Sequence, residues 1–162
     1  MTVGTLRRPM RVYADTSVFG GTRDDIFEAG SNAFFEQVRN GRFQLVVSGL
    51  VEKELRGAPE AVRAVFEEFL ADVEVIQESD RALLLQQAYL DAGILTPNWA
   101  DDALHVALAS VSECSVIVSW NFHHIVNLRR ISLYNAISML HGYRPIEIRS
   151  PVEVLEYDDP VR

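Results

Sequence analysis

RVYADTSVFGG, residues 11–21, joins a short apolar run to a single carboxylate and then to small polar residues and a glycine pair. Residues 11–14 are typical of a strand, and Thr16, Ser17 and the glycines predict that the strand breaks there. Asp15 therefore stands at the carboxyl end of the predicted strand. Ligands of open parallel sheets bind outside the carboxyl ends of the strands, so this acid is a candidate for chemistry. The alternative interpretation is that Asp15 only caps the following turn.

Short β-rich runs alternate with helical segments along the rest of the chain. The predicted strands are residues 11–14, 43–47, 73–76 and 115–118, with a possible edge strand in 146–155 around Pro151. The predicted helices are residues 31–40, with Ser31 as N-cap and Gly41 as stop, 50–56, 59–71, 79–91, 99–114 and about 132–140. This alternation predicts an α/β fold in which helices cover both faces of a parallel sheet.

Length and composition favour one domain. The chain has 162 residues, of which 48% are hydrophobic, and we expect a single domain over residues 10–155 with tails at 1–9 and 156–162. Met10 directly precedes the first predicted strand and is an alternative start to Met1. No uncharged apolar stretch of about 18 residues occurs, and no apolar segment follows the N-terminal arginines, so we expect a cytoplasmic protein without a membrane span.

The net charge and the cysteine content further limit the classes of protein that the sequence fits. The net charge of −8 argues against a protein that holds nucleic acid by its overall field, although bound divalent cations and local arginines would permit a nuclease. The single cysteine, Cys114, lies in an apolar run and is interpreted as a small buried residue, the alternative being a catalytic thiol.

Further acids follow the other predicted strands. SGLVEKELRG, residues 48–57, places Glu52 and Glu54 after the second strand, and NWADDALHVALASV, residues 98–111, places Asp101 and Asp102 in the first turn of an apolar helix. Such a helix is buried, so its first acids lie near the core. The alternative for the aspartates is helix capping and stabilisation of the helix dipole.

The last predicted strand is followed by a polar turn. SWNFHHIVN, residues 119–127, brings Ser119, Asn121, His123 and His124 to this point, although Asn121 is also a common turn residue. Carboxylate and amide oxygens suit Mg²⁺ or Mn²⁺ better than zinc, and the histidines have no zinc spacing. A divalent cation would relieve the repulsion of clustered acids and would activate water against a phosphoryl group.

The order of four motifs, ADTSVF, SGLVEKEL, DALHVALA and VSWNF, resembles PIN-domain ribonucleases, and most of all the VapC toxins of prokaryotic type II toxin–antitoxin pairs. The resemblance spans about residues 10–155. It implies a three-layer α/β/α fold with a central parallel sheet of four to five strands. It also implies an endoribonuclease that cleaves single-stranded RNA with one or two Mg²⁺ or Mn²⁺ ions.

The resemblance also assigns site residues. The acids would be Asp15, Glu54 and Asp102, whereas helical spacing alone places Asp101 closer to the apolar stripe. Asn121 takes a position that is Asp in many PIN enzymes, so it would offer a carbonyl oxygen without charge, and a second ion would bind weakly or only with RNA. Thr16 and Ser17 match hydroxyl positions that orient the first acid or a water, and Ser119 is placed with them.

Other residues complete the expected site. His105, one turn after Asp102, is expected to be a satisfied core histidine or a support for a metal ligand, rather than a ligand or base. Arg23, His123, His124, Arg129 and Arg130 are candidates for phosphate contact, the alternative being ordinary solvated surface.

The toxin resemblance implies a homodimer and a cognate antitoxin that threads a C-terminal segment into the acidic pocket. The predicted helices 31–40 and 59–71 carry aromatic residues, Phe34, Phe35, Phe66 and Phe69, that would serve such partners. The alternative, favoured by the helical spacing of Phe66, Phe69 and Leu70, is that they belong to the core.

Three other functions stay open. A phosphatase of the haloacid dehalogenase type also has an acid after its first strand, but Ser17 stands where its second Asp would be, and the only lysine, Lys53, does not match the later motif of that family. A PIN fold that only binds RNA or protein is the second alternative, which Asn121 makes possible. A housekeeping RNA-processing nuclease is the third.

Overall fold

In the computed structural model, residues 8–156 are described. They form a sheet of five parallel strands in the order β3-β2-β1-β4-β5. The strands are β1 Met10–Ala14, β2 Phe43–Ser48, β3 Glu74–Ile76, β4 Val116–Val118 and β5 Glu147–Arg149. The four predicted strands and the possible edge strand are therefore confirmed, and the sheet has five strands.

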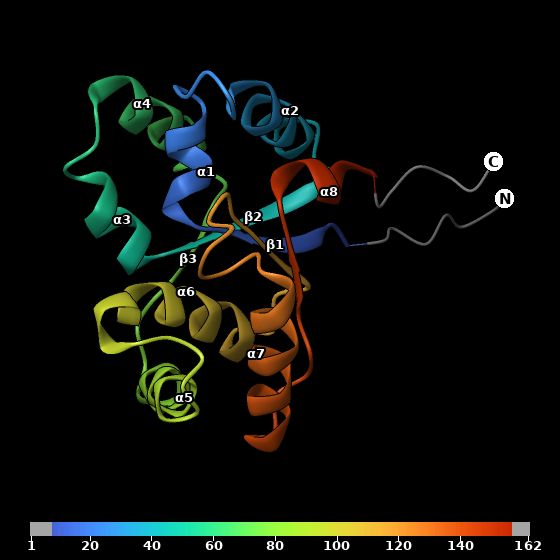
Figure 1. Cartoon of the computed structure of the whole chain (residues 1–162). Coiled ribbons are helices and arrows are strands. Elements are labelled where there is room, and N and C mark those ends of the chain that lie inside the picture. The colour runs from blue at the N-terminus through green and yellow to red at the C-terminus, as the bar shows by residue number, and fades with distance from the viewer. Residues whose placement is uncertain (1–7, 157–162) are drawn as a thin grey trace, which may run out of the picture.

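Helices cover both faces of this sheet. They are α1 Thr16–Gly21, α2 Glu28–Arg39, α3 Gly49–Leu55, α4 Glu60–Phe69, α5 Asp80–Asp91, α6 Ala100–Val111, α7 Leu128–Leu140 and α8 Pro151–Glu156, with a short 3₁₀ helix at Pro97–Trp99. Figure 1 shows α1, α2, α4 and α8 on one side of the sheet and α5, α6 and α7 on the other. The predicted three-layer α/β/α architecture is confirmed.

The central strand positions the site. β1 lies between β2 and β4, and its residues Val12, Tyr13 and Ala14 are fully buried. The chain runs outward from β1 to β2 and β3 on one side, and later to β4 and β5 on the other. The strand order thus reverses between β1 and β4, which is where open α/β sheets form a ligand crevice. Asp15 directly follows β1 at this point.

Several predicted boundaries are wrong. The chain continues after Asp15 as helix α1 instead of breaking, and α2 begins at Glu28, not Ser31. Ser31 is fully buried, and its hydroxyl donates to the Val18 carbonyl at 2.7 Å instead of capping. Helix α6 ends at Val111, because Glu113 adopts a left-handed conformation with φ of 57°.

Two further ends differ from the prediction. Helix α7 begins at Leu128, four residues before the predicted start, because the Asn127 side chain accepts from the amides of Arg129 and Arg130. Residues after Pro151 form helix α8 and not a strand.

The core and the surface follow the sequence pattern. Phe34, Phe35, Phe66 and Phe69 are buried, as predicted, but Leu70 lies after the end of α4 and is half exposed. Cys114 is buried, and burial raises the pKa of its thiol to about 12, which argues against a reactive thiolate.

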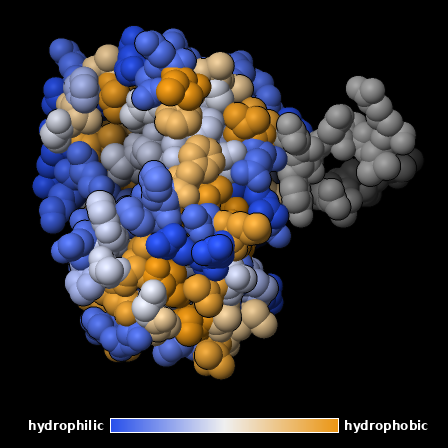
Figure 2. All heavy atoms as spheres, in the orientation of Figure 1, coloured by the Kyte–Doolittle hydropathy of each residue, from blue (hydrophilic) through white to orange (hydrophobic). Residues whose placement is uncertain are grey.

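Figure 2 shows hydrophobic surface gathered over α5 and α7. Exposed hydrophobic residues of these two helices are Leu83, Leu84, Leu128, Leu133, Met139 and Leu140. Within residues 8–156, no helix has the length and apolarity needed to cross a membrane. Most of the predicted terminal tails lies outside the described residues.

Candidate active site

The Asp15 carboxylate is held by two serine hydroxyls. Ser17 donates to Oδ1 at 2.6 Å, and Ser119, which follows β4, donates to Oδ2 at 2.7 Å. Asp15 occupies the N-cap position of α1, but its side chain makes no capping hydrogen bond. The carboxylate therefore joins the ends of β1 and β4 rather than capping a turn.

Backbone amides orient these hydroxyls in turn. The Trp120 amide donates to Ser17 Oγ and the Asn121 amide donates to Ser119 Oγ, both at 2.9 Å. Each hydroxyl accepts one bond and directs its own proton at Asp15. Asp15 is only 4% exposed. Burial raises the pKa of its carboxyl, as does the nearby charge of Asp102, while His105 and the two serines oppose this rise.

Glu54 is tied to a chain of buried hydrogen bonds. His105 Nε2 lies 2.6 Å from Glu54 Oε1, and His105 Nδ1 lies 2.7 Å from the Tyr13 hydroxyl. Tyr13 in turn lies 2.7 Å from the hydroxyl of Ser48, the N-cap of α3. Thr16 donates to the same Glu54 oxygen at 3.1 Å. Glu54 of helix α3 thereby connects the start of α1, through Thr16, with helix α6, through His105.

His105 lies among three carboxylates. Burial lowers the pKa of its imidazole, but the hydrogen bond that it donates to Glu54 and the charges of Asp15, Glu54 and Asp102 outweigh this, and the pKa is raised. Burial raises the pKa of Glu54, but the contacts with His105 and Thr16 outweigh it, and the pKa is lowered. His105 is 2% exposed and both of its ring nitrogens have a partner, so it is a buried, satisfied histidine that supports Glu54.

Asp102 faces the loop after β4. Its Oδ2 lies 3.1 Å from His124 Nδ1. Burial raises the pKa of Asp102, and the charge of Glu54 adds to this, against the opposing effects of His124, His105 and a hydrogen bond with Asn121. Asp101 is exposed and lines a separate groove with Gly49 and Leu50. Of the two candidates that helical spacing left open, the structure places Asp102 with the other acids.

Asn121 contributes to a turn and to Asp102. Its Oδ1 accepts from the His124 amide at 2.9 Å, and the side chain also forms the hydrogen bond that lowers the pKa of Asp102. The carbonyl oxygen expected to face an ion is therefore used within the loop.

Sequence reasoning missed Tyr13 and Ser48. The sequence pattern could have indicated Ser48, because this residue directly follows the second predicted strand just as Asp15 follows the first predicted strand. Tyr13 gave none, because a buried aromatic in a strand is ordinarily core.

The expected phosphate-contacting residues differ in their surroundings. Arg23 and His123 are exposed, and Arg23 comes after the far end of α1. Arg129 is also exposed, whereas Arg130 donates from Nε to the Ile94 carbonyl at 3.2 Å. His124 is partly buried and is part of the site through Asp102.

The donor chemistry at the three acids fits Mg²⁺ or Mn²⁺, because all of the charged ligands are carboxylates. The side chains are nevertheless engaged with protein partners. Across residues 8–156, no three Asp, Glu, His or Cys side chains are grouped as around a bound ion. The site therefore has suitable ligands, but Glu54 and Asp102 are turned to His105 and His124.

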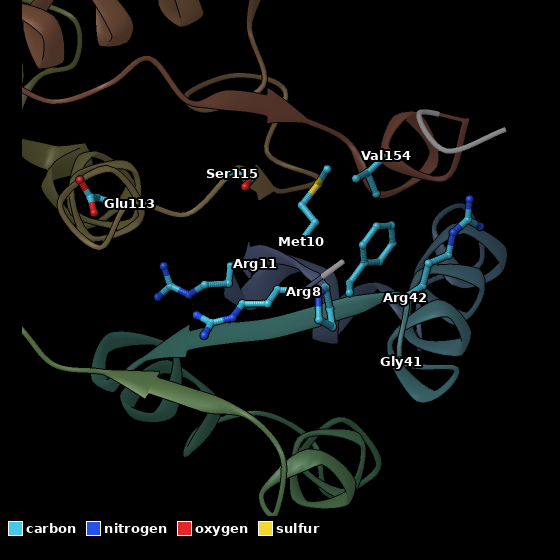
Figure 3. A pocket seen from close by; sticks show the side chains of 10 residues that line it. Arg8, Met10, Arg11, Gly41, Arg42, Glu113, Ser115 and Val154 are labelled. Carbon is cyan, nitrogen blue, oxygen red and sulfur yellow. The ribbon is translucent and has the colours of Figure 1, made fainter. Parts of the chain in front are cut away.

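A separate pocket of about 710 Å³ lies at the other edge of the sheet, by the amino ends of β1, β2 and β4. Three arginines line it, Arg8, Arg11 and Arg42, and Figure 3 shows Arg42 at the opposite end of the pocket from Arg11. Arg11 is bound to the Glu74 carboxylate and the Ser112 carbonyl. The arginines do not converge on one point, so this pocket does not compete with the acids as the site of chemistry.

Comparison with known proteins supports the fold. No family model and no curated protein sequence matches the chain. A chain in the crystal structure of VapBC2 from Rickettsia felis, bound to a DNA fragment from their promoter, is 17% identical with a TM-score of 0.52. The match covers 70% of this chain and 89% of that one. A chain of FitAcB from Neisseria gonorrhoeae is 11% identical with a TM-score of 0.51, and the match covers 86% of this chain and 97% of that one.

These likenesses define the class of fold. The chain has the PIN-like α/β fold, so the resemblance that its motifs carry is confirmed at the level of fold. More particularly, it is similar to chains of VapBC2 and FitAcB.

Proposed function

We propose that this protein is a metal-dependent endoribonuclease that cleaves single-stranded RNA and acts as the toxin of a toxin–antitoxin pair. One observation carries the proposal: Asp15, Glu54 and Asp102 come from three separate segments and lie around the buried His105, whose Nε2 is 2.6 Å from Glu54, at the switch point of a PIN-like sheet. Carboxylates that cluster with no buried lysine or arginine to neutralise them are typical of sites that bind divalent cations.

Each acid has a defined support. Ser17 and Ser119 fix the two oxygens of Asp15, His105 and Thr16 fix Glu54, and His124 and Asn121 fix Asp102. These three acids would hold the ion, with Glu54 and Asp102 giving up part of their present contacts. When bound, Mg²⁺ or Mn²⁺ supplies Lewis acidity toward a phosphoryl oxygen and lowers the pKa of the attacking water. Hydrolysis would add the oxygen of water to phosphorus as the bond to the leaving ribose oxygen breaks, and the proton lost by the water would end on that leaving oxygen.

The partners follow from the same likeness. VapBC2 and FitAcB are complexes, and their fold supports a cognate antitoxin as partner of this chain. The exposed hydrophobic residues on α5 and α7 are consistent with the expected homodimer. A small neighbouring gene for a DNA-binding protein would favour the toxin over a housekeeping nuclease.

The deciding experiment compares Asp15→Asn and Asp102→Asn with Asp101→Asn. We expect Mg²⁺- or Mn²⁺-dependent cleavage of single-stranded RNA by the wild type and by Asp101→Asn, because Asp101 is exposed and outside the cluster. We expect no cleavage by the other two variants, with their folds intact by circular dichroism. Undiminished cleavage by both, or equal activity in EDTA, would contradict the mechanism.

One observation favours a second candidate, a PIN fold that only binds RNA or protein. Asn121 brings no charge and directs its amide at Asp102, so the site has three carboxylates and not four. RNA binding by the wild type without cleavage in either metal would support this alternative.

A further inference from the structure

Trp99 is a large aromatic residue in an unusual place for one. It ends the 3₁₀ helix Pro97–Trp99 directly before α6, three residues ahead of Asp102, and it is 47% exposed. The other tryptophan, Trp120, is explained by packing: its ring stacks on Phe27 at 4.4 Å, and its Nε1 donates to Ser31 Oγ at 2.9 Å. Packing does not explain the half of Trp99 that faces solvent.

The imidazole of His124 backs one face of the Trp99 ring. The ring centroids are 4.2 Å apart and the planes differ by 27°. His124 is itself fixed, because its Nδ1 contacts Asp102 at 3.1 Å and its carbonyl accepts from the Tyr134 hydroxyl at 2.7 Å. The indole is therefore held in place one ring away from a carboxylate of the proposed active site, and little conformational freedom is lost when a ligand stacks on it.

We propose that the exposed surface of Trp99 is a stacking platform for one unpaired base of the RNA strand, next to the phosphate that approaches Asp102. This inference rests on the proposed function and adds the element that recognises the strand. A base can stack on a side chain only when it is unstacked from its neighbours, so the platform selects single strands over duplexes. Every base has a π-face, so the contact tolerates different sequences.

The charge of the protein favours such an uncharged contact. With 23 acidic and 15 basic residues, the protein cannot draw RNA by its overall field, and the acids of the site repel phosphate until cations bind. Stacking adds affinity that does not depend on neutralising phosphates. A platform beside Asp102 would hold the strand at the site while contributing no charge.

The experiment measures RNA binding in an Asp15→Asn background, which removes cleavage. The probe is a short single-stranded oligoribonucleotide that contains 2-aminopurine, whose fluorescence falls when the base stacks. Trp99→Ala should weaken binding roughly 5- to 150-fold, the range seen when a stacking aromatic is removed, and should abolish the quenching. The slope of log Kd against log salt concentration should stay unchanged, because no phosphate contact is lost.

Three further variants separate stacking from structure. Trp99→Phe keeps an aromatic face and should bind within about threefold of the parent, whereas Trp99→Leu covers His124 without a π-face and should bind as poorly as Trp99→Ala. Val152→Ala removes part of an exposed hydrophobic side chain from α8, outside the site and outside the α5–α7 surface, and should bind like the parent.

The outcomes are distinguishable. Equal binding by the parent, Trp99→Ala and Trp99→Leu, with the wild type cleaving RNA, overturns the platform and leaves the nuclease intact. A weakened Trp99→Ala with a reduced salt slope also overturns it, because the contact would then be to phosphate. If the wild type neither binds nor cleaves single-stranded RNA in either metal, the proposed function fails and the platform with it.

Discussion

Replacing His105 by glutamine is expected to destabilise the protein by about 2–3 kcal/mol at pH 6, and by less at pH 9. The substitution removes a 2.6 Å contact with the Glu54 carboxylate and a 2.7 Å contact with the Tyr13 hydroxyl. A hydrogen bond to a charged group contributes about 1.5–3 kcal/mol and a neutral one about 1 kcal/mol. These values sum to about 2.5–4 kcal/mol. The expected loss lies at and just below the lower end of this sum, because the Glu54 side chain is 35% exposed and glutamine can restore one hydrogen bond.

The pH dependence follows from the raised pKa of His105. A base whose pKa is raised on folding contributes stability that is complete below its unfolded pKa and is lost as the pH rises through its folded pKa. The imidazolium faces Asp15, Glu54 and Asp102, so its charge is worth most at pH 6. The hydrogen bonds of the neutral ring remain at pH 9, so the difference between wild type and variant shrinks but does not vanish.

The measurement is urea denaturation followed by circular dichroism at pH 6 and pH 9 in EDTA. For a domain of 162 residues, the loss corresponds to a melting temperature roughly 4–12 °C lower at pH 6. Tyr13→Phe is the matched control: it removes the hydroxyl that contacts His105 and Ser48 but no charged side chain, so its cost should change less between the two pH values than that of His105→Gln. An equal or larger cost of His105→Gln at pH 9 would refute the view that His105 is the counter-ion of the acids.

Two further predictions concern stability. Burial raises the pKa of Asp15, so the ionised carboxylate destabilises the folded protein at neutral pH, and Asp15→Asn should raise the melting temperature in EDTA. Mn²⁺ should raise the melting temperature of the wild type only. Equal stabilisation of both proteins by Mn²⁺ would exclude Asp15 as a ligand. Gly21→Ala should cost about 1–3 kcal/mol, because a Cβ there would lie 2.5 Å from Ser31 Oγ and 2.6 Å from the Trp120 indole, whereas Gly20→Ala, with no atom within 4 Å, should show no such loss in thermal melts.

The sheet and the positions of the acids could be predicted because both depend on local pattern. Four apolar runs of suitable length predicted the strands, and the polar residues after them predicted the working edge. Helical spacing could not predict whether Asp101 or Asp102 belongs to the site. The direction of each side chain distinguishes them, and that direction depends on how α6 packs against the loop after β4.

Other features depend on tertiary contacts that no local pattern reports. Helix α1 forms from residues that predict a break, and its last residue, Gly21, packs closely against Ser31 and Trp120, which come from distant parts of the chain. The bond between Tyr13 and His105 links residues 92 positions apart, and neither residue type predicts the other. The sequence allowed Asn121 to be a turn residue, but its contact with Asp102 could not be predicted without the folded structure.

The hydrogen bond from Ser119 to Asp15 joins residues 104 positions apart in the sequence, and this separation affects when the complete site can form. During synthesis, β1 and its carboxylate emerge early, but the second hydroxyl arrives only after β4 has been made and has paired beside β1. A nascent chain that stops before residue 119 carries all three acids and still lacks this support. For a protein proposed to cut RNA, the order of synthesis thus keeps the complete site from forming until most of the chain has left the ribosome.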